Sequence, residues 1–188
     1  MTFLKQFLLN PLKTGAVAPS SKGLVELITD TANLSSRKCV VEFGSGSGIF
    51  TEKIIEKINP DTTFFSIEIN NNFVQKTKDR CPDATVYLDS ALNIEKYLNK
   101  NKQDSCDCII SGLPLASFSK DLQAYLIDTA YGSLSDGGVF LTFAYIQGSI
   151  LPTGINLKKL LKNKFKSVKK TEIVWKNIPP AFVYYCEK

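Results

Sequence analysis

The chain has 188 residues, of which 44% are hydrophobic, 11% aromatic and 22% charged; this fits one globular domain and excludes a disordered, collagenous or disulfide-rich protein. The formal net charge is +5 and is unevenly distributed: residues 38–152 carry ten bases and fourteen acids, whereas residues 153–188 carry nine bases and two acids. An acidic middle beside basic ends favours a cationic ligand and an anionic partner surface, although a solvated lysine-rich face would produce the same distribution.

The N-terminal residues predict two helices. The first spans residues 1–12, ends at Pro11 and carries apolar side chains on one side: Phe3, Leu4, Phe7 and Leu8. Beside Lys5 and Lys13, this apolar side would suit either a membrane interface or a lid over a ligand. A second helix is expected to end at Asp30, with Ser20 or Ser21 as its N-cap. We expect residues 1–32 to form a lid or membrane-contact segment.

From residue 39 onward, apolar strands alternate with amphipathic helices. Strands are expected at 39–43, 62–68, 84–88, 106–111 and 139–145, followed by a hairpin of 168–175 and 181–186. Helices are expected at 48–58, 70–81, 92–101, 122–134 and around 157–165, with a turn at 135–138. In the first of these helices the isoleucines are expected to face inward: Ile49, Ile54, Ile55 and Ile58. This alternation predicts a single Rossmann-like α/β domain over residues 1–188: a seven-stranded, mostly parallel sheet with helices on both faces and a C-terminal antiparallel hairpin.

A glycine-rich loop, residues 44–48, follows the first predicted strand. Glycines leave room where the backbone must turn and a ligand must approach, and open α/β sheets bind ligands at this edge. The spacing is G-x-G-x-G, whereas dinucleotide sites use G-x-G-x-x-G, and Glu42 precedes the loop. A carboxylate there would repel a diphosphate and attract the amino group and sulfonium of S-adenosylmethionine. A purely structural turn would explain the glycines alone.

Two further acidic residues at strand ends favour S-adenosylmethionine. Glu68 ends the second strand, where it could accept hydrogen bonds from ribose hydroxyls, and Asp89 follows the third, where it could accept from the adenine amine. The sequence therefore predicts a methyltransferase that uses this cofactor, with no metal. The predicted cofactor-binding residues are Glu42, Gly44, Ser45, Gly46, Gly48, Glu68, Ile69, Asp89, Ser90, Ala91 and Ser111.

The acceptor loop, Ser111-Gly112-Leu113-Pro114-Leu115, follows the fourth strand, where this fold presents the methyl group. It looks like the N-L-P-Y or D-P-P-Y loops of adenine methyltransferases, but Ser111 replaces the Asn or Asp and Leu115 replaces the aromatic. A small aliphatic amine would fit better than a flat base, and a plain structural loop is the alternative. The predicted catalytic residues are Tyr145, Ser111, Gly112, Leu113 and Pro114. Tyr145 would orient the amine, since the chain has no histidine base, unless it is an ordinary buried tyrosine.

With these motifs, the segments 14–21 (Thr-Gly-Ala-Val-Ala-Pro-Ser-Ser) and 175–181 (Trp-Lys-Asn-Ile-Pro-Pro-Ala) make the chain similar, nearly end to end, to the bacterial phospholipid N-methyltransferase family. The resemblance implies a class I methyltransferase fold and methylation of phosphatidylethanolamine toward phosphatidylcholine. It also implies that the N-terminal helix contacts an anionic membrane. Ser45 and Ser47 depart from the family's usual Pro or Thr, and Ala144 from its usual Thr.

The remaining features bear on location and partners. The five cysteines, the absence of a signal peptide and the absence of a run of roughly 20 apolar residues indicate a cytoplasmic protein with free thiols. The resemblance implies that this protein is attached peripherally to the inner face of the cell membrane. Cys106 and Cys108 are expected to be core side chains of a strand. The expected partner is a phospholipid rather than a nucleic acid. A ribosomal RNA adenine methyltransferase, a small-molecule amine methyltransferase and a non-catalytic membrane protein that binds the cofactor remain alternatives.

Overall fold

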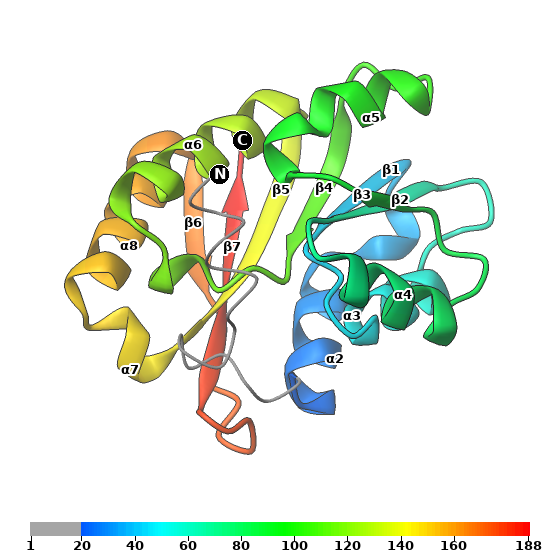
Figure 1. Cartoon of the computed structure of the whole chain (residues 1–188). Coiled ribbons are helices and arrows are strands. Elements are labelled where there is room, and N and C mark those ends of the chain that lie inside the picture. The colour runs from blue at the N-terminus through cyan, green and yellow to red at the C-terminus, as the bar shows by residue number, and fades with distance from the viewer. Residues whose placement is uncertain (1–19) are drawn as a thin grey trace.

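A computed structural model describes residues 20–188 as one twisted sheet with helices on both faces (Figure 1). The sheet has seven strands in the order β3-β2-β1-β4-β5-β7-β6. Neighbours from β3 to β5 are parallel, whereas β7 is antiparallel to both β5 and β6. The strands are β1 (Cys39–Phe43), β2 (Thr63–Glu68), β3 (Val86–Leu88), β4 (Cys106–Ser111), β5 (Leu134–Tyr145), β6 (Ser167–Lys170) and β7 (Ala181–Glu187). The predicted fold class, including the closing hairpin, is confirmed.

Two hydrophobic layers hold the helices against the sheet. The helices are α2 (Lys22–Thr31), α3 (Ile49–Lys57), α4 (Asn71–Arg80), α5 (Ile94–Lys100), α6 (Lys120–Ser133), α7 (Ile146–Ser149) and α8 (Pro152–Lys164), with short 3-10 turns η2 (Leu34–Ser36), η3 (Ala91–Asn93) and η4 (Leu115–Ser117). Side chains of α2 and α3 form one layer with one face of the sheet, and those of α5, α6 and α8 form the other layer, while Val74 of α4 packs in a small separate cluster with Val86 of β3. Alternate residues of each central strand therefore point into different layers.

The start of α2 agrees with the predicted cap, whereas α6 begins two residues earlier than predicted and one residue of the predicted inward face of α3 is exposed. The Ser21 hydroxyl accepts a hydrogen bond from the Leu24 N–H at 3.3 Å, which confirms it as the N-cap of α2. In α3, Ile54 is buried as predicted, but Ile55 is 39% exposed. Phe50 and Thr51 are buried in its place, because they share the face of Ile54 one turn earlier.

The chain differs from prediction around β5. That strand begins at Leu134, although residues 135–138 were expected to form a separate turn. Gly137 has φ +72°, and pairing with β4 shifts register from Cys106–Leu134 to Cys108–Val139. The predicted turn is thus an irregularity within a longer strand. The short helix α7, after β5, was not predicted.

All five cysteines are buried and free. Burial raises the pKa of the Cys39, Cys108 and Cys186 thiols to about 12, and it also raises the pKa of Cys81 and Cys106. The prediction that Cys106 and Cys108 are core side chains of a strand is confirmed.

The predicted helix over residues 1–12, with its apolar residues and Lys5 and Lys13, lies outside the described residues. Within residues 20–188, no helix is long and apolar enough to cross a bilayer.

Candidate functional site

The predicted cofactor residues meet because the first four strands are parallel. Their carboxyl ends share one edge of the sheet, where Phe43 is in register with both Ile67 and Ser111. A small pocket opens at this edge, lined by Gly44, Ile67, Glu68, Ile69, Asp89, Ala91 and Leu113. Six of these residues were predicted site residues. Ile67 was missed, because an apolar residue inside a strand carries no sequence signal of exposure to a ligand.

The loop after β1 requires its glycines. Gly44, Gly46 and Gly48 have φ values of +79°, +54° and +79°, a region that other residues rarely adopt. The Gly44 N–H donates to the Ile67 carbonyl at 2.8 Å. A β-carbon on Gly44 would lie 2.6 Å from Cδ2 of Leu113. The loop is therefore pressed against both β2 and the acceptor loop.

Glu68 joins two segments beneath the pocket. Its Oε2 accepts from the Gly46 N–H at 3.0 Å, and its Oε1 accepts from the Asn70 N–H at 2.8 Å. Only 4% of the residue is exposed. Desolvation raises the pKa of this carboxyl, although the backbone N–H donors act in the opposite direction. Glu68 thus fixes the glycine loop and lines the pocket at the same time.

Asp89 lies in the pocket as predicted, but its carboxylate already has four donors. Oδ1 accepts from the Ser90 N–H and the Asn93 amide, and Oδ2 accepts from the Tyr97 hydroxyl and the Lys96 ammonium. Burial raises the pKa of Asp89, but these donors outweigh burial and lower it to about 2. Asp89 is therefore ionised, and an adenine amine would have to share or replace one of its donors. Three of those donors come from residues that the sequence did not single out.

Two predicted cofactor residues do not line the pocket. Glu42 is fully buried, and its Oε2 accepts from the Thr51 hydroxyl of α3 at 2.6 Å, whereas its Oε1 has no partner. Burial raises the pKa of Glu42 to about 7, against the effect of its hydrogen bonds. The Ser45 hydroxyl accepts from the Thr77 hydroxyl at 2.9 Å. Glu42 therefore ties the end of β1 to α3, and Ser45 ties the glycine loop to α4.

The acceptor loop packs directly on the glycine loop. The Gly112 N–H donates to the Phe43 carbonyl at 2.8 Å, and a β-carbon on Gly112 would lie 2.5 Å from the Gly44 carbonyl oxygen. The Ser111 hydroxyl is buried and accepts from the Leu113 N–H at 3.3 Å. Leu113 lines the pocket, whereas Leu115 is only 1% exposed. The fifth position of the loop thus enters the core and presents nothing on which a base could stack.

Gln123 of α6 fixes the shape of the acceptor loop from behind. This fully buried amide donates to the carbonyls of Leu115 at 2.9 Å, Phe118 at 3.3 Å and Thr153 at 3.0 Å. Its oxygen accepts from the Asn156 amide of α8 at 2.8 Å. The sequence did not reveal this role, because a glutamine in an amphipathic helix ordinarily faces solvent.

Tyr145 ends β5 at the same edge of the sheet. Its ring packs edge-to-face on Phe143 with the ring centroids 5.5 Å apart, in the layer of α2 and α3. Burial raises the pKa of its hydroxyl. Ser111 lies on the opposite face, because it alternates with Ile110, which belongs to the layer of α2 and α3. Of the predicted catalytic residues, only Leu113 lines the pocket.

The site suits a ligand that carries positive charge. Glu68 and Asp89 line the pocket, and Oε1 of Glu42, at the end of β1, is buried without a hydrogen-bond partner. Buried carboxylates are stabilised when a cation compensates them. These carboxylates therefore fit the sulfonium, amine and ribose hydroxyls of S-adenosylmethionine, and they disfavour a diphosphate.

Comparison with known proteins agrees with this geometry. The model of the family described as ribosomal RNA adenine dimethylase matches residues 20–144. The chain is also 25% identical over 189 residues to the ornithine lipid N-methyltransferase of Singulisphaera acidiphila, covering 98% of this chain and 93% of that protein.

Solved structures share the fold. The O-methyltransferase TomG of Streptomyces achromogenes, in complex with S-adenosylmethionine, has a TM-score of 0.72 and 15% identity, covering 98% of this chain and 88% of TomG. The N-methyltransferase NodS of Bradyrhizobium japonicum, in complex with S-adenosylhomocysteine, has a TM-score of 0.64 and 14% identity, covering 85% of this chain and 83% of NodS. These likenesses confirm the Rossmann-like methyltransferase fold.

Proposed function

The chain belongs to the ribosomal RNA adenine dimethylase family. Within this family, we propose that it methylates the amine of a membrane lipid, with phosphatidylethanolamine as the acceptor. It is an S-adenosylmethionine-dependent methyltransferase. The acceptor and the residue roles are the proposed part. A lipid amine is supported by the similarity to an ornithine lipid N-methyltransferase along nearly the whole chain.

The observation that carries this proposal is the acceptor loop. Recognition of a flat adenine uses a side-chain amide or carboxylate and an aromatic ring stacked on the base. Here Ser111 stands at the polar position, and Leu115 is buried in the core. Leu113, although only 7% exposed, is the member of the loop that lines the pocket, so a compact aliphatic amine on an apolar lipid is the better match.

The cofactor would be held by the pocket residues at the carboxyl edge. We assign the ribose hydroxyls to Glu68, the adenine amine to Asp89, and the surrounding contacts to Gly44, Ile69 and Ala91. Ser45, Gly46, Gly48 and Ser90 support these contacts through the shape of their loops, and Glu42 through its charge. S-adenosylmethionine supplies a methyl group on a positively charged sulfur.

The chain's own contribution to catalysis is to position a neutral amine. Approach in line with the carbon–sulfur bond is an effect of orientation, which can lower a barrier substantially. We assign the holding of the amine to the backbone of Ser111 and Gly112, shaped by Leu113 and Pro114, with Tyr145 as an orienting group. The chain has no histidine, so the proton leaves through one of these groups or through water.

The reaction would take place at the inner face of the cell membrane, with the protein attached peripherally. The basic C-terminal segment supports this location, because each lysine near an anionic surface contributes roughly 1 kcal/mol of attraction. Four lysines lie on α8: Lys158, Lys159, Lys162 and Lys164.

The test uses methyl-labelled S-adenosylmethionine with three acceptors: vesicles that contain phosphatidylethanolamine, vesicles that contain ornithine lipid, and ribosomal RNA. We expect label in the lipid extract of the first. Label in ornithine lipid alone would show that the acceptor is ornithine lipid and not phosphatidylethanolamine. Label in RNA alone would refute a lipid acceptor. Cofactor binding without transfer to any acceptor would favour a non-catalytic binding protein.

A further inference from the structure

Two segments expose apolar side chains that the cofactor site does not use. Nine large apolar side chains of the described residues are well exposed, and six of them fall in these two short segments. We call them the docking rim: Ile150 and Leu151 between α7 and α8 with Ile155 in the first turn of α8, and Ile173, Trp175 and Ile178 between β6 and β7. Their exposed fractions reach 71% at Ile150, 69% at Trp175 and 80% at Ile178. Clustered exposed apolar groups of this kind mark interaction surfaces.

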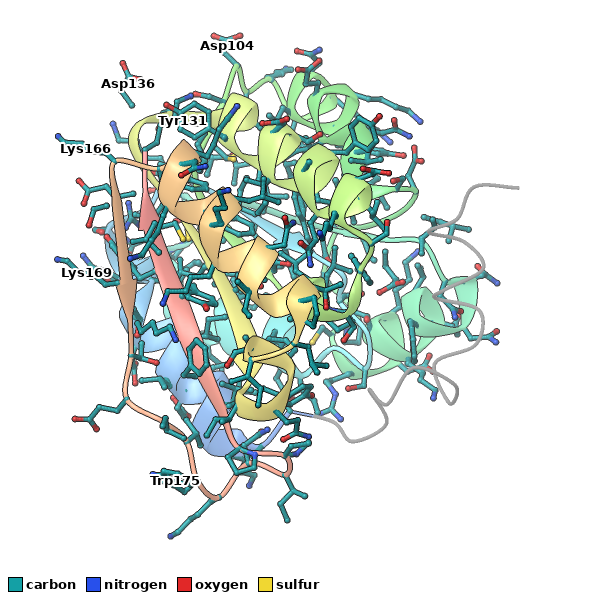
Figure 2. The ribbon with its side chains drawn as sticks, turned by 90° about the vertical axis from the view of Figure 1, so that its left-hand side faces the viewer. Asp104, Tyr131, Asp136, Lys166, Lys169 and Trp175 are labelled. Atoms are coloured by element: carbon teal, nitrogen blue, oxygen red, sulfur yellow. The ribbon has the colours of Figure 1, made fainter. Side chains whose placement is uncertain are left out.

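The two segments lie at one edge of the molecule. The first leaves β5 after Tyr145 and the second enters β7 at Ala181, two residues that are paired in the sheet. The Ile146 N–H also donates to the Pro180 carbonyl at 3.0 Å. Trp175 lies at the lower end of the molecule in Figure 2, opposite Asp104 and Asp136. The docking rim therefore shares the carboxyl edge of β5 with the site.

The second segment is held in place while its apolar side chains point outward. Asn177, only 2% exposed, stands between Trp175 and Ile178. Its Oδ1 accepts from the Ser21 N–H at 2.9 Å, and its Nδ2 donates to the Pro179 carbonyl at 2.6 Å. Val174 pairs with Ala181 in an isolated bridge. A loop fixed in this way loses little conformational freedom when it meets a partner.

Positive charge borders the docking rim. Lys176 lies between Trp175 and Ile178, and Lys158 follows Ile155 by three residues in α8. Residues 150–178 carry eight lysines and one acidic residue, Glu172, which precedes Ile173. Tryptophan beside aliphatic and lysine side chains is the composition that favours the boundary between acyl chains and anionic headgroups.

We propose that the docking rim inserts into the surface of an anionic bilayer and so brings the carboxyl edge of the sheet onto the membrane. The inference deepens the proposed function, because it assigns described residues to membrane contact. The contact of Ser21 with Asn177 also joins the start of α2 to the loop that carries Trp175 and Ile178.

Trp175 is the only tryptophan of the chain, so its fluorescence reports on the docking rim directly. The probe is a vesicle of phosphatidylglycerol and phosphatidylcholine, which offers no primary amine, and S-adenosylmethionine is omitted. We expect the emission to shift to shorter wavelength, acrylamide quenching to fall, and high salt to weaken both effects. An unchanged spectrum at vesicle concentrations that bind the protein would overturn the proposal.

Paired variants locate the contact. The double substitution Ile150→Ser and Ile178→Ser should lower vesicle partitioning at least about tenfold, because two apolar side chains that would move from water into the bilayer are removed. Tyr125→Ser, on the exposed surface of α6, should leave partitioning unchanged. Equal losses in both variants would contradict the docking rim. Trp175 emission that is already at shorter wavelength and protected from acrylamide in buffer without vesicles would also contradict the docking rim. In that case residues 1–19 or a second copy of the chain would cover the loop.

The docking rim and the proposed function can fail separately. Partitioning without transfer of methyl groups to lipid leaves the rim intact and refutes the lipid acceptor. Methylation of phosphatidylethanolamine dispersed in detergent, without partitioning to vesicles, supports the lipid acceptor and refutes the docking rim.

Discussion

At the scale of single residues, the charge of Glu68 should contribute to the binding of S-adenosylmethionine. Its carboxylate receives backbone donors from both sides of the pocket and has most of its surface withdrawn from water. Glu68→Gln keeps the shape of the side chain and removes its charge. We expect the dissociation constant for S-adenosylmethionine to rise about tenfold or more, measured by isothermal titration calorimetry. Glu95→Gln, on the exposed side of α5, is the matched control, and equal affinity in the two variants would refute the assignment.

The raised pKa of Glu42 should make the free energy of unfolding depend on pH. Its pKa is about 7 in the folded chain, against 4.5 for an ordinary glutamate, so the folded state binds this proton more tightly. The resulting stabilisation is fully present below about pH 4.5 and is lost as the pH rises to about 7, for a change of about 3 kcal/mol. Glu42→Gln has no such proton to lose.

Urea denaturation of both proteins between about pH 4 and about pH 8 measures this change. The free energy of unfolding of the wild type, relative to Glu42→Gln, should fall as the pH rises. A constant difference would show that Glu42 ionises normally.

Tyr145 provides a test of catalysis. If its hydroxyl orients the amine, Tyr145→Phe should lower turnover on phosphatidylethanolamine vesicles about tenfold and leave the affinity for S-adenosylmethionine unchanged. Tyr125→Phe removes an exposed hydroxyl from α6 and serves as the control. Unchanged turnover in Tyr145→Phe would leave the residue with its packing contact on Phe143 alone.

At the scale of elements, the contact between the two site loops leaves no room for a methyl group. In Gly112→Ala the new carbon would meet the Gly44 carbonyl oxygen at 2.5 Å, and neither backbone can move without disturbing β1 or β4. We expect a loss of about 2 kcal/mol in the free energy of unfolding and weaker cofactor binding. Gly132→Ala, where nothing lies within 4 Å in the last turn of α6, should instead stabilise by about 0.5–1 kcal/mol. Equal effects of the two substitutions on denaturant unfolding would contradict the close contact.

The elements that the sequence predicts best are those with local signals. The bounds of β1 and β4 match, because each is an apolar run that ends at a glycine-bearing loop. The start of β5 was missed, because the glycine turn at 135–138 is accommodated by pairing with β4, a contact remote in the chain. Ile55 was misplaced because two adjacent isoleucines in α3 do not reveal which of them faces the sheet.

The site divides in the same way. Strand order alone brings Gly44, Glu68 and Asp89 to one edge, so their meeting could be predicted. The four donors of Asp89 and the bonds of Gln123 could not, because they depend on how η3, α5, α6 and α8 pack. Burial of Leu115 also depends on that packing, and it is the feature that separates this loop from a base-stacking one.

At the scale of the whole molecule, cofactor binding should stabilise the fold. The glycine loop, β2, the segment that follows β3 and the acceptor loop all contribute residues to the pocket, so a bound ligand contacts all four. A ligand at a hundred times its dissociation constant adds about 2.7 kcal/mol. For a chain of this size that raises the melting temperature by about 5–10 °C. Differential scanning fluorimetry with S-adenosylmethionine should show the shift, and NAD⁺ at the same concentration should not; a similar shift with NAD⁺ would contradict the electrostatic selection.

The burial of all five thiols has a practical consequence for the intact fold. Only a thiolate reacts rapidly with alkylating reagents, and burial keeps these sulfurs both protonated and out of reach. The native chain should therefore behave as a thiol-free background on which a cysteine introduced at position 178 is labelled alone. The same five sulfurs become reactive when the layers separate, so their alkylation rate records how often the molecule opens.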